Sequence, residues 1–183
     1  MSIPSSPVGS RRLALAVIAA AQFMVIMDTS IIGVALPEMQ ADLGFSPGGL
    51  SWVFNAYVVA FGGLLLLGGR IPDYGARKRT FILGLVGLAF ASALGGLAPT
   101  AGLLFGARAL QGVFAALLAP AALSLITVTF TESKERAKAF GVYGAISGGG
   151  AAIGLIVGGI LTEYASWRWC LLVNVPFALL TVA

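Results

Sequence analysis

The 183-residue sequence contains no histidine and a single cysteine, Cys170. The lack of histidine excludes histidine-based catalytic triads, histidine metal ligands and histidine proton relays. One cysteine cannot form a disulfide within the chain or build a zinc cluster. Charged side chains make up only 10% of the residues, against roughly 25% in an ordinary soluble domain. Too few polar side chains are left to cover a water-facing surface, which excludes a soluble globule.

Long apolar runs fill most of the chain, which is 58% hydrophobic with a mean hydropathy of +0.98. A membrane-spanning helix needs roughly 20 apolar residues. Five runs meet this length: residues 13–36, 50–69, 80–97, 103–128 and 140–161. A sixth begins near Trp169 and is still apolar at Ala183, so we expect the chain to end inside a truncated sixth span. The runs do not alternate with polar residues, which favours an all-α polytopic membrane protein over a β-barrel.

The basic residues predict the orientation in the membrane. Nine of the 11 fall on one side: two before the first run, four between the second and third, and three between the fourth and fifth. They are Arg11, Arg12, Arg70, Arg77, Lys78, Arg79, Lys134, Arg136 and Lys138. By the positive-inside rule this side is cytoplasmic. We therefore expect a cytoplasmic N-terminal tail (1–12) and a helical bundle (13–183) in the cell inner (plasma) membrane, and no binding of nucleic acid.

Local signals mark the outer boundaries of the runs. Ser46 followed by Pro47 predicts a helix start, with serine as the N-cap and proline in the first turn. Trp52, Trp167 and Trp169 fall near predicted outer boundaries. Aromatic rings favour the headgroup region of a membrane, so we expect all three tryptophans to act as anchors.

Two charged residues lie within the runs, where a lone charge costs several kcal/mol unless it faces water or a partner. Asp28 lies eight residues before the outer end of the first run, and Arg108 lies five residues into the fourth. At 1.5 Å per residue, they are roughly 12 Å and 8 Å below the outer surface. We expect both to face an aqueous interior and to interact; alternatively, one snorkels to the boundary. Gln111, on the same helical face as Arg108, either extends this polar site or hydrogen-bonds a neighbouring helix.

The fifth run is unusually rich in glycine. Gly150, Gly154 and Gly158 recur at every fourth residue, a spacing that lets another helix approach closely. Static packing and an interface that slides between two conformations both agree with this stripe. The loop at 69–79 is short and places Asp73 among four cations. Asp73 either pairs with a neighbouring arginine, or lies at a helix N-terminus, or belongs to a solvated topology loop.

Six short motifs follow one another along the chain. They are MDTSIIGVALP (27–37), WVFNAYVVAF (52–61), GRIPDYGARKR (69–79), ARALQGVFAA (107–116), GAAIGLIVGG (150–159) and SWRWCLLVNVPF (166–177). Each is weak alone, but in this order and spacing they resemble the N-terminal half of a major facilitator superfamily transporter. The similarity is greatest to the drug:proton antiporter branch with fourteen predicted spans, and it covers nearly the whole chain.

The resemblance implies three groups of functional residues. One would serve proton coupling and line the substrate cavity: Asp28, Arg108 and Gln111. The loop motif would latch the two halves of the transporter on the cytoplasmic side: Gly69, Asp73, Arg77 and Lys78. The antiporter motif of the fifth span would form a bend and the interface with the other half: Gly150, Gly154, Gly158 and Gly159. Leu155 stands where this last motif usually has proline.

The resemblance also implies a function. We expect a secondary transporter that exports drugs or other small amphipathic molecules in exchange for protons, by alternating access of two helical bundles around a site near the midplane. Its partners would be a small-molecule substrate, protons, the lipid bilayer and the missing C-terminal half. We expect no cofactor and no metal, with the proton gradient as the energy source, and we do not expect an enzyme.

Two alternatives stay open at this stage. A proton-coupled uptake symporter of the same superfamily shares most of the motifs, and Leu155 removes part of the signal for antiport. The second alternative is that the chain does not transport, and is a truncated fragment, an assembly partner or half of a homodimer. A half bundle exposes its glycine-rich face and polar cavity, so it needs a partner to be stable.

Overall fold

The computed structural model describes residues 8–70 and 77–182, and every regular element within them is an α-helix. They follow in the order α1 (Val8–Leu43), α2 (Pro47–Arg70), α3 (Arg77–Gly96), α4 (Ala101–Thr129), α5 (Ser133–Tyr164), α6 (Trp167–Leu172) and α7 (Asn174–Val182). The first five are long and apolar enough to cross a membrane. The predicted all-α fold with five full spans is therefore confirmed. α2 begins at Pro47 as predicted, whereas α1 already begins at Val8, within the expected tail.

The sixth apolar run forms two short helices instead of one. α6 ends at Leu172, Val173 stands between the helices, and α7 begins at Asn174. Pro176 accounts for the break, because proline has no N–H to donate to the carbonyl of Leu172. In the first turn of α7 the missing N–H is harmless, since the first N–H groups of a helix have no partner within it. The break thus places Asn174 at the start of a new helix.

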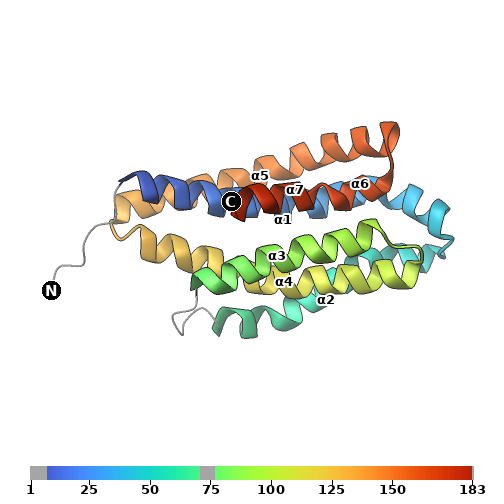
Figure 1. Cartoon of the computed structure of the whole chain (residues 1–183), viewed down its shortest axis with the longest axis horizontal. Coiled ribbons are helices and arrows are strands. Elements are labelled where there is room, and N and C mark those ends of the chain that lie inside the picture. The colour runs from blue at the N-terminus through green and yellow to red at the C-terminus, as the bar shows by residue number, and fades with distance from the viewer. Residues whose placement is uncertain (1–7, 71–76, 183) are drawn as a thin grey trace.

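The helices form two layers (Figure 1). α1, α5 and the α6–α7 pair make up one layer, in which α1 packs along α5. α2, α3 and α4 make up the other layer, in which α4 packs against both α2 and α3. The layers meet where α3 contacts α6 and α7 and where α1 contacts α4. Side chains of α1 and α4 that point toward each other therefore lie at the boundary between the layers.

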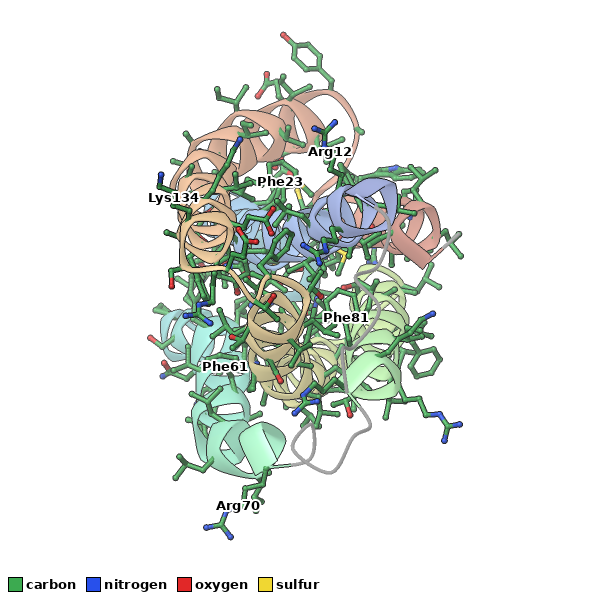
Figure 2. The ribbon with its side chains drawn as sticks, turned by 90° about the vertical axis from the view of Figure 1, so that its left-hand side faces the viewer. Arg12, Phe23, Phe61, Arg70, Phe81 and Lys134 are labelled. Carbon is green, nitrogen blue, oxygen red and sulfur yellow. The ribbon has the colours of Figure 1, made fainter. Side chains whose placement is uncertain are left out.

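The two ends of the bundle carry different groups. Figure 2 views the end at which α1 begins and shows Arg12, Arg70 and Lys134 there; we call it the basic end. Arg11 of α1 also lies at this end and pairs with Glu135 of α5, with 3.1 Å between Nη1 and Oε2. The cations that the sequence assigned to one side of the membrane thus gather, as far as the structure describes them, at one end of the bundle.

A clamp around Arg168 holds the opposite end together. The Arg168 guanidinium donates hydrogen bonds to the carbonyl oxygens of Gly96, at 3.3 Å, and Ala98, at 2.7 Å. It also pairs with Asp42 at 3.1 Å and lies over the ring of Trp167, 4.5 Å from the centroid. Asp42 belongs to α1, whereas Gly96 and Ala98 lie at the end of α3 and just beyond it. The clamp therefore joins the two layers at this end.

The same clamp corrects the role predicted for Trp167. Its ring is buried, with 3% exposed, and its Nε1 donates a hydrogen bond to Asp42 Oδ2 at 3.0 Å. Trp167 is therefore a packing residue of the clamp, and the prediction of a headgroup anchor is wrong for this position. Trp52 and Trp169 are 55% and 53% exposed, which agrees with an anchoring role for those two.

Glycine brings α5 into close contact with α1. Gly150, Gly154 and Gly158 are buried. A Cβ atom on Gly154 would lie 2.9 Å from the Cβ of Ser30, and one on Gly158 would lie 2.9 Å from Cγ1 of Ile31. Real Cβ atoms are essentially never found so close to such neighbours. The fourth-residue spacing of the stripe therefore serves helix packing within this chain.

This packing predicts the effect of adding one methyl group. We expect Gly154→Ala to lower the free energy of unfolding by about 1–3 kcal/mol, because the added carbon overpacks the contact with α1. Gly159→Ala is the matched control, since nothing lies within 4 Å of the added carbon. That variant should be neutral or slightly stabilising, because alanine favours helices more than glycine does. Thermal unfolding of the purified variants in detergent measures both, and equal midpoints would contradict the packing argument.

Candidate functional site

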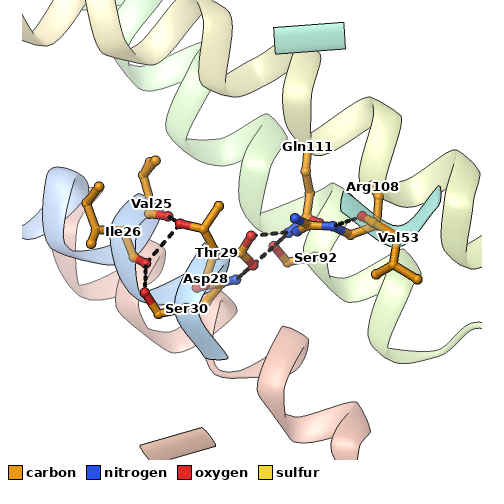
Figure 3. Close-up of polar contacts among 10 residues, drawn as sticks. Val25, Ile26, Asp28, Thr29, Ser30, Val53, Ser92, Arg108 and Gln111 are labelled. Atoms are coloured by element: carbon orange, nitrogen blue, oxygen red, sulfur yellow. Dashed lines mark hydrogen bonds and ion pairs between the residues drawn. The ribbon is translucent and has the colours of Figure 1, made fainter. Parts of the chain in front are cut away.

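A buried ion pair links the two layers near the middle of α1. Arg108 Nη1 of α4 lies 2.6 Å from Asp28 Oδ2 of α1 (Figure 3). The exposed fractions of the two side chains are 0% and 1%. Charge-assisted hydrogen bonds of this length are among the strongest in proteins. The pair thus fixes the position of α1 on α4 at a depth where water does not reach it.

Three uncharged polar side chains complete a network around the pair. Gln111 Nε2 donates to Asp28 Oδ1 at 2.9 Å and to Ser92 Oγ at 2.6 Å. Asn174 Nδ2 donates to the same Oδ1 at 2.5 Å and to Ser92 Oγ at 3.1 Å. Ser92, Gln111 and Asn174 are each 0% exposed. Asp28 therefore accepts three hydrogen bonds, and each amide nitrogen makes two contacts, the number of hydrogens it carries.

Arg108 is held by three further contacts. Its Nε donates to the carbonyl oxygen of Val53 in α2 at 3.1 Å, and its Nη1 donates to Gln111 Oε1 at 2.7 Å. The guanidinium carbon lies 4.7 Å from the centroid of the Tyr57 ring, where the negative face of the ring attracts a cation. Nη2 has no hydrogen-bond partner. The guanidinium is therefore oriented by α1, α2 and α4 together.

The charges of this network balance only while Asp28 is ionised. One carboxylate and one guanidinium then cancel, and the three donors around Asp28 suit a group that only accepts hydrogen bonds. A proton on Asp28 would leave the buried charge of Arg108 without a counter-charge, which is strongly unfavourable. The directions of the hydrogen bonds around Asp28 therefore match an ionised carboxylate.

The structure brings together the three residues expected to serve proton coupling and line the substrate cavity: Asp28, Arg108 and Gln111. We expected an aqueous interior beside them, but the pair is instead enclosed by packed helices. Sequence reasoning missed Ser92 and Asn174, because a single serine or asparagine in an apolar run does not stand out. For Asn174 a signal existed in Pro176, which breaks the sixth run just beside it.

The glycines of the fifth span occupy different positions from those implied by the resemblance. Gly150, Gly154 and Gly158 face α1 of this chain, so in this structure they are not free to contact a second half. Gly159 does not take part in this contact, because nothing lies within 4 Å of the position that its Cβ atom would occupy. The four residues therefore do not form one surface, and only the first three share a packing contact.

The loop-motif residues lie far from the ion pair, as far as they are described. Asp73 falls outside the described residues. Arg77 Nε donates to Ser124 Oγ of α4 at 2.8 Å, whereas Gly69 has no neighbour within 4 Å of its Cβ position. Lys78 contributes to a pocket of about 490 Å³ at the basic end, which is mostly apolar and lined by α1, α3, α4 and α7. None of the residues of the ion-pair network lines this pocket.

A second polar cluster joins α1 and α5 nearer the basic end. Gln22 Nε2 donates to Ser147 Oγ at 2.9 Å, and the Tyr143 hydroxyl donates to Gln22 Oε1 at 2.6 Å. All three side chains are half-buried. Across residues 8–70 and 77–182, no three cysteine or acidic side chains come together to hold a metal ion. Hydrogen-bonding and charged groups are thus the chemistry that the described bundle offers.

The ion pair predicts strong coupling between two substitutions. We expect Arg108→Met to lower the free energy of unfolding by about 3–5 kcal/mol, because it leaves the Asp28 carboxylate buried without its counter-charge. Adding Asp28→Asn to that variant should recover part of the loss, and a double-mutant cycle on thermal unfolding measures the coupling. Arg11→Met removes a partly exposed pair with Glu135 and should cost no more than about 1 kcal/mol. Additive effects of the two buried substitutions would contradict the interpretation.

Comparison with known proteins places this network in a family. The family model described as Major Facilitator Superfamily matches residues 18–183. The chain is 61% identical over 168 residues to puromycin resistance protein pur8 of Streptomyces alboniger, covering 92% of this chain and 33% of that protein. It is 45% identical over 175 residues to cephamycin export protein CmcT of Amycolatopsis lactamdurans, covering 96% and 36%. The chain thus spans about a third of the length of these curated relatives.

Solved structures show the same fold. A bacterial homolog of the human lysosomal transporter Spinster, inward-facing and unoccupied, aligns with a TM-score of 0.79 at 18% identity, covering 97% of this chain and 43% of that one. Tetrameric PepTSo2 aligns with a TM-score of 0.74 at 17% identity, covering 94% and 40%. Such low identities show the fold alone. Together with the family match over residues 18–183, they lead to one conclusion: the chain belongs to the major facilitator superfamily.

Proposed function

We propose that this chain forms part of a proton-coupled efflux pump for drugs or other small amphipathic molecules. The observation that carries the proposal is the enclosed pair of Asp28 and Arg108, which joins the two helical layers. The names of the relatives support export, since they include a cephamycin export protein and a multidrug efflux pump, LfrA of Mycolicibacterium smegmatis, which is 38% identical over 167 residues. Both are transporters by name, so a transporter is favoured over an enzyme.

The pair supplies a physical reason for coupling to protons. In the closed bundle Arg108 holds Asp28 as a carboxylate, so the site is stable when dry and unprotonated. A proton on Asp28 cancels the attraction between α1 and α4 and leaves the guanidinium in need of water or another anion. Protonation therefore favours a state in which the layers have moved and the site is wetted. Alternating between these states would let the proton gradient drive export without a cofactor.

The orientation and the remaining motifs fit the same proposal. The positive-inside rule supports a cytoplasmic position for the basic end, which would put the first turn of α1 at the inner face of the plasma membrane. The loop motif, with Asp73 and Lys78, would latch this bundle to a second one at that face. Gly159 and the other open glycines of α5 leave a smooth surface on which the second bundle packs.

The proposal predicts the loss of proton-driven transport in one variant of the full-length protein. In proteoliposomes with an imposed pH gradient, Asp28→Asn should abolish proton-driven export of a fluorescent amphipathic cation, because the site can no longer change its charge. The variant leaves Arg108 without its counter-charge, so its insertion and folding are checked by expression level and by size-exclusion chromatography of the purified protein. The matched control is Glu163→Gln, the same change from acid to amide at an exposed position of α5 outside the network and the clamp, which should export nearly as well as the wild type.

A chimera tests whether this chain is equivalent to the corresponding segment of a named relative. The chain would replace the matching third of pur8 from Streptomyces alboniger, and puromycin resistance would be scored in a sensitive host. We expect the chimera to confer resistance and its Asp28→Asn version to fail. If Asp28→Asn exports as well as the wild type under a pH gradient, the coupling role is wrong. Accumulation inside cells instead of export would favour an uptake symporter.

A further inference from the structure

The side-chain amides of Gln111 and Asn174 both donate a hydrogen bond to Oδ1 of Asp28. Only Asn174 has an amide oxygen without a hydrogen-bond partner. Gln111 Oε1 accepts a hydrogen bond from Arg108 Nη1 at 2.7 Å. Asn174 Oδ1 has no hydrogen-bond partner, although the residue is fully buried. A buried polar atom without a partner destabilises a protein, and in native structures such an atom generally has a specific reason.

Protonation of Asp28 supplies that reason. Before the layers move, Oδ2 of Asp28 stays beside Arg108, so the new O–H bond forms at Oδ1. A hydronium ion from the bulk aqueous phase supplies the proton and becomes water. This hydrogen needs an acceptor where the two amides now present donors. Gln111 cannot supply one without breaking its bond to Arg108. Rotation of the Asn174 amide about its last side-chain torsion exchanges Nδ2 and Oδ1, and it places the free oxygen against the new O–H.

We propose that Asn174 is a positioning residue whose amide rotates with the protonation state of Asp28; the proposal rests on the proton coupling argued above. While Asp28 is ionised, Nδ2 donates to it, because the rotated amide would set an oxygen against a carboxylate. Once Asp28 is protonated, Oδ1 of Asn174 accepts its hydrogen. Ser92 follows the rotation, because its hydroxyl can accept from Nδ2 or donate to Oδ1. The Asn174 amide can thus form a hydrogen bond with Asp28 in both the ionised and the protonated form of the acid.

The position of Asn174 permits this rotation. It is the first residue of α7, directly after the break at Val173. Its side chain makes both of its hydrogen bonds through Nδ2, so exchanging nitrogen for oxygen changes both contacts at once. Movement of α6 against α7 at the break would carry the amide toward or away from Asp28. The proton step and the sixth apolar run are therefore connected through one residue.

The other groups around Asp28 do not offer the same choice. Arg108 from α4 is a permanent cation with donors only. Tyr57 from α2 and Cys170 from α6 are titratable side chains within electrostatic reach of the Asp28 carboxylate. α3 contributes the hydroxyl of Ser92, and α5 presents glycine to this part of α1. Among these groups, the amide of Asn174 is the one whose contact with Oδ1 can invert from donor to acceptor.

The test uses three variants of the full-length protein in proteoliposomes. Asn174→Leu keeps the shape of the side chain and removes both its donor and its acceptor. Asn174→Asp keeps the shape but sets a second carboxyl group beside Asp28, so that the two share a proton. Asn55→Leu is the matched control, because Asn55 is exposed on α2 and lies outside the network. Two rates are recorded across a pH series: export driven by a pH gradient, and transport driven by a substrate gradient alone.

We expect Asn174→Leu to lower proton-driven export about tenfold, the rate change expected from one hydrogen bond to a charged group, and to leave substrate-driven transport nearly unchanged. Asn174→Asp should move the pH profile of export upward by about one unit, because two neighbouring carboxyls cannot both ionise readily. Asn55→Leu should behave as the wild type. Equal loss of both rates in Asn174→Leu, with an unshifted pH profile for either variant, means that Asn174 only supports the fold and overturns the proposal.

A spectroscopic readout separates this proposal from the proposed function. An infrared difference spectrum between acidic and neutral pH records the Asp28 carboxyl group and any amide that changes with it. We expect an asparagine amide band that is lost in both Asn174→Leu and Asp28→Asn and is retained in Asn55→Leu. If the wild type does not couple transport to protons, this band still decides whether the amide rotates. A carboxyl band of Asp28 without an asparagine band would reject the rotation, and the absence of both bands would reject it as well.

Discussion

A charge enclosed among apolar helices is stable only beside its counter-charge. In this bundle the guanidinium of Arg108 meets the carboxylate of Asp28 where the layer of α1 faces the layer of α4. The pair therefore does more than neutralise two groups: it sets how the layers lie on each other. Gln111 and Asn174 donate to Asp28, Gln111 and the carbonyl oxygen of Val53 orient Arg108, and Ser92 accepts a hydrogen bond from each of the two amides.

Packing within each layer follows a different rule. Lipid tails are as apolar as leucine, so helices in a membrane associate through close contact and polar links instead of hydrophobic burial. Glycine supplies the close contact in both layers. A Cβ on Gly154 would collide with Ser30 of α1, and one on Gly112 would collide with the carbonyl of Tyr57 in α2. Each layer is thus held by backbone proximity. The boundary between the layers combines apolar packing, including the close approach of Gly96 in α3 to Leu172 in α6, with the charges and hydrogen bonds of the network.

Much of the fold could be predicted from the sequence, because a 20-residue apolar run has few solutions in a bilayer. The meeting of Asp28 and Arg108 followed from two charges at similar depths. What could not be predicted was the enclosure of the pair, which depends on side chains from helices far apart in sequence. Asn174 was missed because hydropathy does not register one amide in an apolar run. Trp167 was misassigned because its partner, Asp42, lies 125 residues away.

The clamp around Arg168 has a mechanical consequence. It ties α1 and α6 to the end of α3 by an ion pair and two hydrogen bonds to carbonyl oxygens, whereas the other end of the bundle has a mostly apolar hollow of about 490 Å³ between the same layers. The two layers are therefore fastened to each other by polar contacts at the Arg168 end, with a hollow between them at the far end, and Asp28 lies between the two.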